Sequence, residues 1–153
     1  MVGGEGSTFG RCTELFAALG KRVTHMGPSG SGQATKLVNQ VAVLGNLLAT
    51  CEALRLAAAA GLDCGRVLDA VGAGAGASWQ LANLGPKILA RDFAPGFPVR
   101  LARKDLRLVL EAAEELHVPL PLVRLVGALF DALGAAGADD QGTQALARIA
   151  EAR

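Results

Sequence analysis

Three polar side chains at helical spacing are the residues in this sequence best placed to do chemistry. Lys36, Asn39 and Gln40 stand at positions i, i+3 and i+4, so a helix would carry them on one face. A lysine ammonium can donate a proton, and the two amides can hold a polar substrate by hydrogen bonds. The same face continues through Val43 and Leu47, so the polar group interrupts an otherwise apolar stripe.

A glycine-rich segment precedes this group, with glycines at Gly27, Gly30 and Gly32. Glycines can take positive φ and let the backbone pass close to a bound group, and the helix that follows would direct free N–H groups into the same space. The spacing is G-x-x-G-x-G, which differs from the dinucleotide fingerprint G-x-G-x-x-G. The glycines can equally form an ordinary turn, and Lys36 can simply extend into water. Both interpretations stay open on spacing alone.

A second cluster is basic. Four cations share the first turns of a helix expected to begin at residue 99: Arg100, Arg103, Lys104 and Arg107. Cations at this end oppose the helix dipole and cost roughly a few tenths of a kcal/mol each. A phosphate or carboxylate partner would remove that cost. The alternative is a solvated basic face, partly paired with Asp92 or Glu111.

Other acid–base and metal chemistry finds little support. The chain has no tyrosine, and its two histidines, His25 and His117, lack a second ligand or a triad partner at useful spacing. Its three cysteines form no C-x-x-C pair, which predicts free thiols, no metal site and a reducing compartment, the cytoplasm. Lys36 is therefore the best-placed acid–base residue by elimination.

Composition limits the class of protein. A chain of 153 residues is long enough for a real core, and a net charge of +1 shows neither a nucleic-acid footprint nor a polybasic membrane tract. Asn46, Glu52 and Arg55 interrupt the longest apolar run, so we expect no clear membrane span. Abundant alanine and leucine with few aromatic residues favour a mainly all-α fold.

The expected elements begin with a short β-α-β segment. Met1–Gly4 and Lys21–Met26 suit strands, and Ser7 or Thr8 is expected to cap a helix that packs Leu15 and Leu19 inward and stops at Gly20 in a left-handed turn. A central helix of about 28 residues should follow and end at Gly61. Further helices are expected over residues 64–71, 79–90, 99–116 and 120–136, and over a final segment to 150 that Asp139 or Asp140 caps. In this prediction Asp63 caps the first of these helices, Ser78 caps the second, and Trp79 anchors the core.

The glycine-rich segment and its lysine resemble the catalytic-lysine motif of the β-hydroxyacid dehydrogenase family, which contains 3-hydroxyisobutyrate dehydrogenase and tartronate semialdehyde reductase. Three further stretches follow in family order: Glu52-Ala-Leu-Arg-Leu, Arg91-Asp-Phe-Ala-Pro-Gly-Phe97 and Arg103-Lys-Asp-Leu106. The resemblance covers essentially the whole chain. The patterns K-L-x-N-Q and R-D-F-x-P-G-F resemble the tartronate semialdehyde reductase branch most.

The resemblance implies a fold and a set of site residues. It implies a 6-phosphogluconate-dehydrogenase-like C-terminal helical domain over residues 27–153, and it makes residues 1–26 a remnant of a dinucleotide-binding domain. By the same resemblance Lys36 is the general acid–base and Lys104 contacts NAD or NADP. The implied substrate-binding residues are Gly30, Gly32, Asn39 and Gln40. Which of the two amides touches the substrate stays open, because many relatives carry asparagine at the position of Gln40.

The implied function is reversible reduction of a small semialdehyde or 3-oxo acid by a homo-oligomer, with the cofactor bound mainly by an N-terminal domain outside residues 1–153. No nucleic-acid or membrane partner is expected. The alternative is a non-catalytic helical oligomerisation module, or a truncated fragment without activity of its own. Retention of Lys36, Asn39 and Lys104 indicates descent from a catalyst, without showing that these 153 residues catalyse a reaction.

Overall fold

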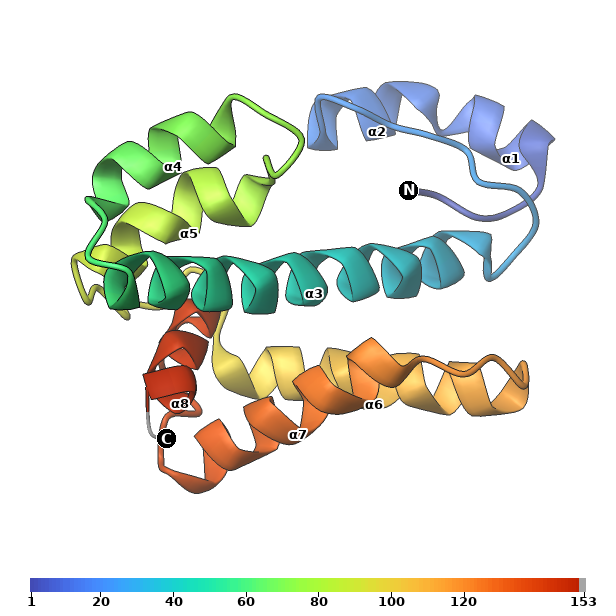
Figure 1. The fold of residues 1–153 in the computed structure, drawn as a ribbon. Coiled ribbons are helices and arrows are strands. Elements are labelled where there is room, and N and C mark those ends of the chain that lie inside the picture. The colour runs from blue at the N-terminus through green and yellow to red at the C-terminus, as the bar shows by residue number, and fades with distance from the viewer. Residues whose placement is uncertain (152–153) are drawn as a thin grey trace. The chain divides into compact units, whose positions relative to one another are not determined.

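A computed structural model describes residues 1–151 of the chain, and it is mostly helical (Figure 1). The elements in chain order are α1 (Gly6–Arg11), α2 (Thr13–Leu19), α3 (Ser31–Ala59), α4 (Cys64–Gly72), α5 (Trp79–Leu89), α6 (Val99–Glu115), α7 (Pro121–Ala135), the 3₁₀ helix η1 (Thr143–Ala145) and α8 (Leu146–Glu151). The predicted mainly all-α fold is confirmed.

The chain divides into two compact units, Met1–Gln40 and Val41–Arg153. The long helix α3 begins in the first unit and continues in the second. The boundary expected after residue 26 was inferred from the family resemblance, whereas the two compact units divide after Gln40. The expected boundary stays a prediction. Residues 152 and 153 of the expected helical domain lie outside the described residues.

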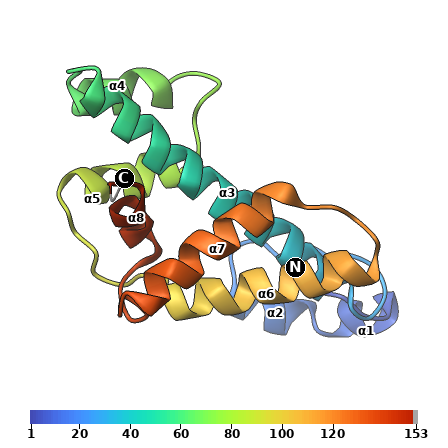
Figure 2. The same ribbon diagram turned by 60° about the horizontal axis from the view of Figure 1, so that its bottom comes forward.

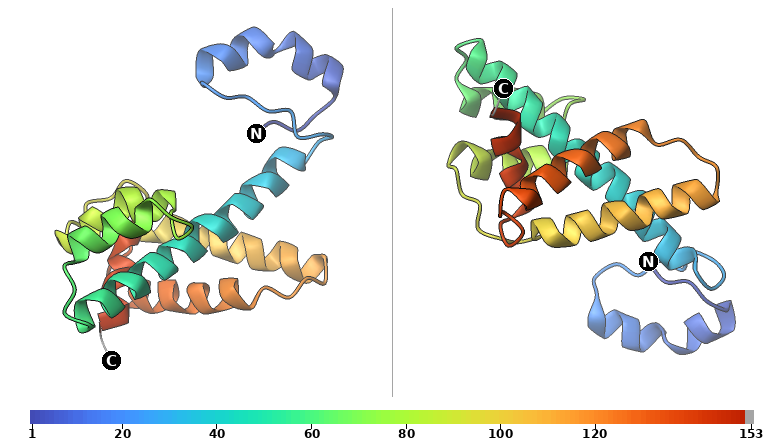
Figure 3. Two further views of the ribbon diagram at one scale, coloured as in Figure 1. Left: turned by 45° about the horizontal axis from the view of Figure 1, so that its top comes forward. Right: turned by 90° about the horizontal axis from the view of Figure 1, so that it is seen from below.

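The first unit contains the expected β-α-β segment in reduced form. Val2 and His25 form a parallel bridge, in which the Val2 N–H donates to Thr24 O at 2.9 Å and the Met26 N–H donates to Val2 O at 2.8 Å. Helices α1 and α2 connect the two bridged segments (Figure 3). Parallel neighbours need such a crossover because a tight turn can join only antiparallel strands.

The helix expected from residue 8 to 19 is broken into two. Cys12 separates α1 from α2, and the Thr13 hydroxyl donates to Gly10 O at 2.9 Å. The predicted caps are wrong: Glu5 holds the N-cap position without a side-chain bond, and Gly20 is extended (φ −162°) rather than left-handed.

The predicted burial of the apolar face of this helix is also wrong. Leu15 and Leu19 on α2 are exposed, Leu19 by 77%. Helical periodicity showed which side chains share a face, but it holds no information on whether another element covers that face.

Helix α3 forms as expected and ends before Gly61, which takes a positive φ of 71°. Its part in the second unit contributes Leu44, Leu47 and Leu54 to the core. By length and composition alone α3 could cross a membrane, as could the core helix of many soluble proteins. We expected no clear membrane span, and α3 meets the criteria of length and composition alone.

In the second unit, residues 41–59 of α3 lie between the α4–α5 pair and the α6–α7 pair (Figure 1). The helices α6 and α7 run side by side in every view (Figures 1 and 2). These two helices contribute much of the buried apolar core: Val99, Ala102, Leu106, Val109, Val123, Val126, Phe130 and Leu133. Alternation of these residues at three and four positions is the spacing of an apolar helical face.

Two predicted N-caps in the second unit are confirmed. The Asp63 carboxylate accepts hydrogen bonds from the N–H groups of Gly65 (2.9 Å) and Arg66 (3.1 Å), and the Ser78 hydroxyl accepts one from the Leu81 N–H (3.0 Å). Such caps use only residues within one turn, so the local sequence determines them.

Two other expectations in this unit are wrong. Trp79 is 64% exposed and does not anchor the core. Asp139 and Asp140 do not cap the last segment, because their carboxylates bind arginines of α6, and η1 begins later, after Gly142.

Candidate functional site

The three polar residues at the start of α3 form one hydrogen-bonded group. Lys36 Nζ donates to Gln40 Oε1 at 2.8 Å, and Asn39 Nδ2 donates to the same oxygen at 2.8 Å. Gln40 is 2% exposed, whereas Lys36 and Asn39 are exposed. The group thus presents an ammonium and an amide outward from a buried amide. This arrangement can donate a proton and hold a small polar ligand.

The apolar stripe around Lys36 does not desolvate it. Sequence spacing placed the lysine on a face that is otherwise apolar, yet its side chain is exposed. Its position is instead defined by the bond to Gln40.

The glycine-rich segment has different roles at different positions. Gly27 and Gly30 both have positive φ (117° and 92°), and a Cβ at Gly30 would meet nothing within 4 Å. A Cβ at Gly32 would lie 2.9 Å from Gly3 N and 3.1 Å from Met1 O. Gly32 is therefore needed for the close approach of α3 to the N-terminal segment, whereas Gly30 borders open space. Of the two, Gly30 is the better placed to contact a ligand with its backbone.

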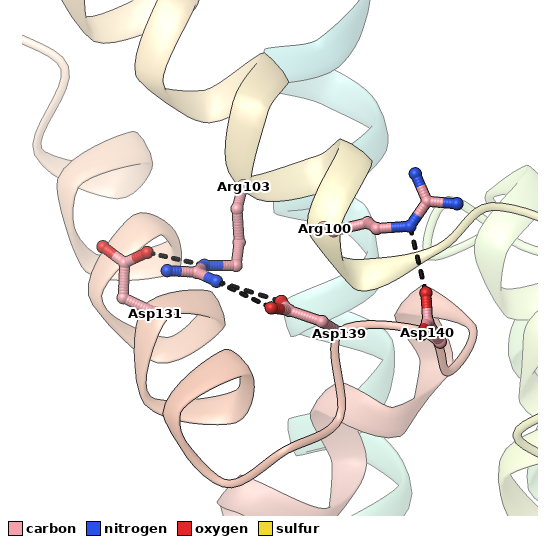
Figure 4. A network of polar contacts seen from close by, with 5 residues as sticks. All are labelled: Arg100, Arg103, Asp131, Asp139 and Asp140. Carbon is pink, nitrogen blue, oxygen red and sulfur yellow. Dashed lines mark hydrogen bonds and ion pairs between the residues drawn. The ribbon is translucent and has the colours of Figure 1, made fainter.

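The basic cluster at the start of α6 is paired within the protein. Arg103 bonds to Asp131 and Asp139, both at 2.9 Å, and Arg100 bonds to Asp140 at 3.0 Å (Figure 4). The hydrogen bonds to Asp131 and then to Asp139 raise the pKa of Arg103 above its usual value. These arginines join α6 to α7 and to the loop that follows α7, so they serve the fold.

The other two cations of the cluster have partners nearby. Arg107 pairs with Glu111 at 2.6 Å, as the alternative of a solvated face predicted. Lys104 Nζ lies 2.8 Å from Asp105 Oδ1, and its side chain is 53% exposed. Asp92, the other expected partner, pairs with Lys87 at 3.6 Å. The structure thus favours the solvated, internally paired face over an anion site that spans the whole cluster.

The loop that contains R-D-F-A-P-G-F is fastened by a residue that sequence reasoning missed. The buried Gln144 side chain donates to Asp92 O at 2.9 Å and to Ala94 O at 3.1 Å, and the Thr143 N–H donates to Phe97 O at 2.9 Å. A side chain at Gly142 would collide with the Gln144 amide. No motif signals this contact, since Gln144 lies about 50 positions away in the chain.

A cavity of about 490 Å³ lies next to this loop in the second unit. Its lining is largely apolar, from Val43, Leu47, Trp79, Leu84 and Phe97, with Gln80 and Thr143 among the polar members. Trp79, which is largely exposed, lies at this cavity and not in the core.

Residues 1–151 contain no cluster of metal ligands, and one of the three thiols is buried and unreactive. No group of His, Cys, Asp and Glu in that range could hold a metal ion. The three cysteines are free, and burial raises the pKa of the Cys51 thiol to about 12, which keeps it neutral and inert. The predicted free thiols are confirmed.

Comparison with known proteins identifies related sequences and folds. Residues 30–150 match the family model described as NAD-binding of NADP-dependent 3-hydroxyisobutyrate dehydrogenase. An uncharacterized oxidoreductase of Synechocystis sp. is 47% identical over 97% of this chain and 50% of its own length. The 2-hydroxy-3-oxopropionate reductase of Escherichia coli is 38% identical over 99% of this chain and 52% of its own.

The fold is also found among solved structures. The 3-hydroxyisobutyrate dehydrogenase of Mycobacterium tuberculosis, solved with L-serine, matches with a TM-score of 0.91 and 28% identity over 99% of this chain and 54% of that one. The enzyme of the same name from Salmonella typhimurium matches with a TM-score of 0.89 and 29% identity, over 96% and 52%. The chain spans about half the length of the relatives it matches.

Proposed function

The chain belongs to the 3-hydroxyisobutyrate dehydrogenase family, and we propose that it supplies the proton-transfer machinery for reversible reduction of a small semialdehyde or 3-oxo acid. The observation that carries this proposal is the group at the start of α3, where an exposed lysine and an exposed asparagine share one buried acceptor. The 2-hydroxy-3-oxopropionate reductase relative and the K-L-x-N-Q pattern favour the tartronate semialdehyde branch.

Lys36 is the proposed general acid–base. A lysine in water is an ammonium at neutral pH, so it can donate a proton to the carbonyl oxygen of a substrate as that oxygen gains negative charge. In the reverse direction the neutral amine accepts the proton of the substrate hydroxyl. Asn39, exposed beside it, would hold the substrate by hydrogen bonds, and the open backbone at Gly30 would border the ligand.

The matched family uses a nicotinamide dinucleotide, and the residues present fit one. Lys104 forms an ion pair with Asp105 and is half exposed, and an ammonium has three N–H donors, so donors remain for a phosphate or ribose oxygen. A bound reduced nicotinamide would supply the hydride, that is, the proton and two electrons that the carbonyl carbon gains. The family description names both NAD and NADP. In this proposal the other residues of the cofactor site determine which of the two is bound.

We also propose self-association and a cytoplasmic location. Several large apolar side chains of the second unit are exposed: Leu56, Leu116, Val118, Leu122 and Leu125. Leu122 and Leu125 line a groove with Val41 and Leu48 of α3, and burying such a surface against a second copy is favourable. The free cysteines support a reducing compartment. Nucleic acid and membrane are not proposed as partners.

The test joins this chain to the nucleotide-binding half of the Escherichia coli reductase. We expect the joined protein to reduce tartronate semialdehyde, and we expect Lys36→Ala to lower kcat by about 100-fold or more while nicotinamide binding persists. Lys21→Ala, which removes another exposed lysine of the first unit, is the control. Near-parental turnover in Lys36→Ala would remove the assignment. The 153-residue chain by itself should show no turnover, because it contains no G-x-G-x-x-G loop.

A further inference from the structure

We infer that Gln40 is a positioning residue whose amide oxygen orients Lys36 and Asn39, rather than a residue that touches the substrate. The inference rests on the proposed function, because it concerns how the same site is organised. Three observations carry it: a shared acceptor atom, the burial of that residue, and the donor chemistry of the lysine.

The shared acceptor is Gln40 Oε1. Lys36 Nζ and Asn39 Nδ2 each lie 2.8 Å from it, within the range of a good N–H···O hydrogen bond. A carbonyl oxygen has two lone pairs, and two donors use both. The oxygen therefore has no capacity left for a substrate hydroxyl.

Burial excludes the same contact independently. Gln40 is 2% exposed, whereas both of its donors are exposed. An ordinary i, i+4 pair on a helix surface would leave both side chains in water, where such a pair contributes only about 0.2–0.5 kcal/mol. A hydrogen bond to a buried acceptor restricts its donor more strongly, because without Lys36 one lone pair of a desolvated oxygen would have no donor. The geometry thus favours one arrangement of the lysine.

The chemistry of the lysine fixes the orientation of both amides. An ammonium has three donors and no acceptor, so the Gln40 atom that faces it must be the oxygen. The Asn39 atom that faces this oxygen must then be its nitrogen. Asn39 consequently offers its carbonyl oxygen, with one remaining N–H, to a ligand. That acceptor suits a substrate hydroxyl better than a carboxylate.

The hydrogen bond to Gln40 restricts the position of the Lys36 ammonium, which matters for catalysis. One N–H of Lys36 is bound to Gln40, and two remain for the reacting oxygen. A free lysine side chain samples many rotamers, and holding a catalytic group in a productive geometry is a major source of rate enhancement. Removing the acceptor should therefore lower kcat more than it changes KM.

A direct test uses NMR on the 153-residue chain, without cofactor or activity. In the unchanged chain, the two hydrogens of the Asn39 side-chain amide should differ, with one protected from exchange with water by about tenfold or more. Gln40→Met, which keeps the length of the side chain but removes the acceptor, should abolish that difference. Gln40→Glu, which keeps an acceptor, should retain it.

Thr50→Val is the matched control, because Thr50 is a buried polar residue of the same helix whose hydroxyl donates to Asn46 O, one turn earlier, at 2.8 Å. It should leave the Asn39 signals unchanged. Two equally fast Asn39 hydrogens in the unchanged chain would overturn the inference, even if Gln40→Met failed to fold. Retained protection in a folded Gln40→Met would also overturn it.

The joined two-domain protein provides the second readout. We expect Gln40→Met to lower kcat by about tenfold or more with KM changed less than about twofold, and Gln40→Glu to restore most of kcat. A higher KM with unchanged kcat would make Gln40 a substrate ligand and refute the inference. Failure of the proposed function looks different, because Lys36→Ala would then keep its turnover while the NMR result on Gln40 still stood.

Discussion

Replacing Gly32 with alanine tests whether this glycine serves the fold or the substrate. The family resemblance implied a substrate role for both Gly30 and Gly32, yet their surroundings differ. A Cβ at residue 32 would lie 2.9 Å from Gly3 N, 3.1 Å from Met1 O and 3.3 Å from Val2 C. All three are backbone atoms, which cannot rotate away as the end of a flexible side chain can.

The expected magnitude follows from two opposing effects. Overpacking of this kind costs about 1–3 kcal/mol. Alanine recovers about 0.5 kcal/mol through its higher helix propensity, even in the first turn of α3. The net loss of about 0.5–2.5 kcal/mol corresponds to a change of roughly 2- to 60-fold in a local opening equilibrium. The N-terminal segment should absorb it, because its bridge to His25 depends on the two bonds of Val2 and on the Gly4 N–H bond to Gly27 O.

Amide hydrogen exchange measures this opening residue by residue. In Gly32→Ala, the N–H groups of Val2, Gly4 and Met26 should exchange faster by the stated factor, while core amides of the second unit stay unchanged. Gly10→Ala is the control, since a Cβ at Gly10 of α1 meets nothing within 4 Å. Unchanged protection in Gly32→Ala would refute the packing argument. If the joined enzyme then also lost substrate affinity, the substrate role of Gly32 would be restored.

Three further predictions concern the second unit. Phe130→Ala should lower the free energy of unfolding by about 3–5 kcal/mol in urea denaturation, since the ring is fully buried, and a loss below about 1 kcal/mol would contradict its central place. Burial raises the pKa of the Cys51 thiol from 9.0 to about 12, so this thiol ionises at lower pH in the unfolded chain than in the folded one. The contribution of Cys51 to the free energy of unfolding is therefore constant below pH 9 and falls between pH 9 and 12. Iodoacetamide at pH 8.5 should label Cys12 and Cys64 before Cys51, as mass spectrometry would show. Sedimentation equilibrium at micromolar concentration should detect self-association that Leu125→Glu weakens, and a single species near 15.6 kDa would refute it.

The features that sequence predicted well depend on neighbours within one or two turns. The extent of α3, its end before Gly61 and the caps at Asp63 and Ser78 all follow from local patterns and are present. The grouping of Lys36, Asn39 and Gln40 on one face is local in the same sense. Which of the two amides is buried was not predictable, because burial depends on what covers the helix.

The features that sequence missed depend on distant partners. Trp79 was expected in the core because aromatic residues are usually buried, yet it lines a cavity formed with Phe97. The partners expected for the basic cluster were Asp92 and Glu111, and of these two only Glu111 pairs with a cation of the cluster. Asp131 and Asp140 lie 28 and 40 positions from the arginines they bind. No spacing rule connects residues so far apart.

The ion pairs of the arginines reduce the positive charge that α6 could offer to a cofactor. Gly134 leaves room for the Arg103 guanidinium, since a Cβ there would lie 2.5 Å from Nη1. Asp131 and Asp139 then hold Arg103 from two sides, so its charge is used inside the fold. Arg100 and Arg107 are each paired as well. An anionic ligand at α6 would therefore meet four cations that each have an acidic partner. Under the proposed function it would bind through the remaining N–H donors of Lys104 rather than through a broad positive field.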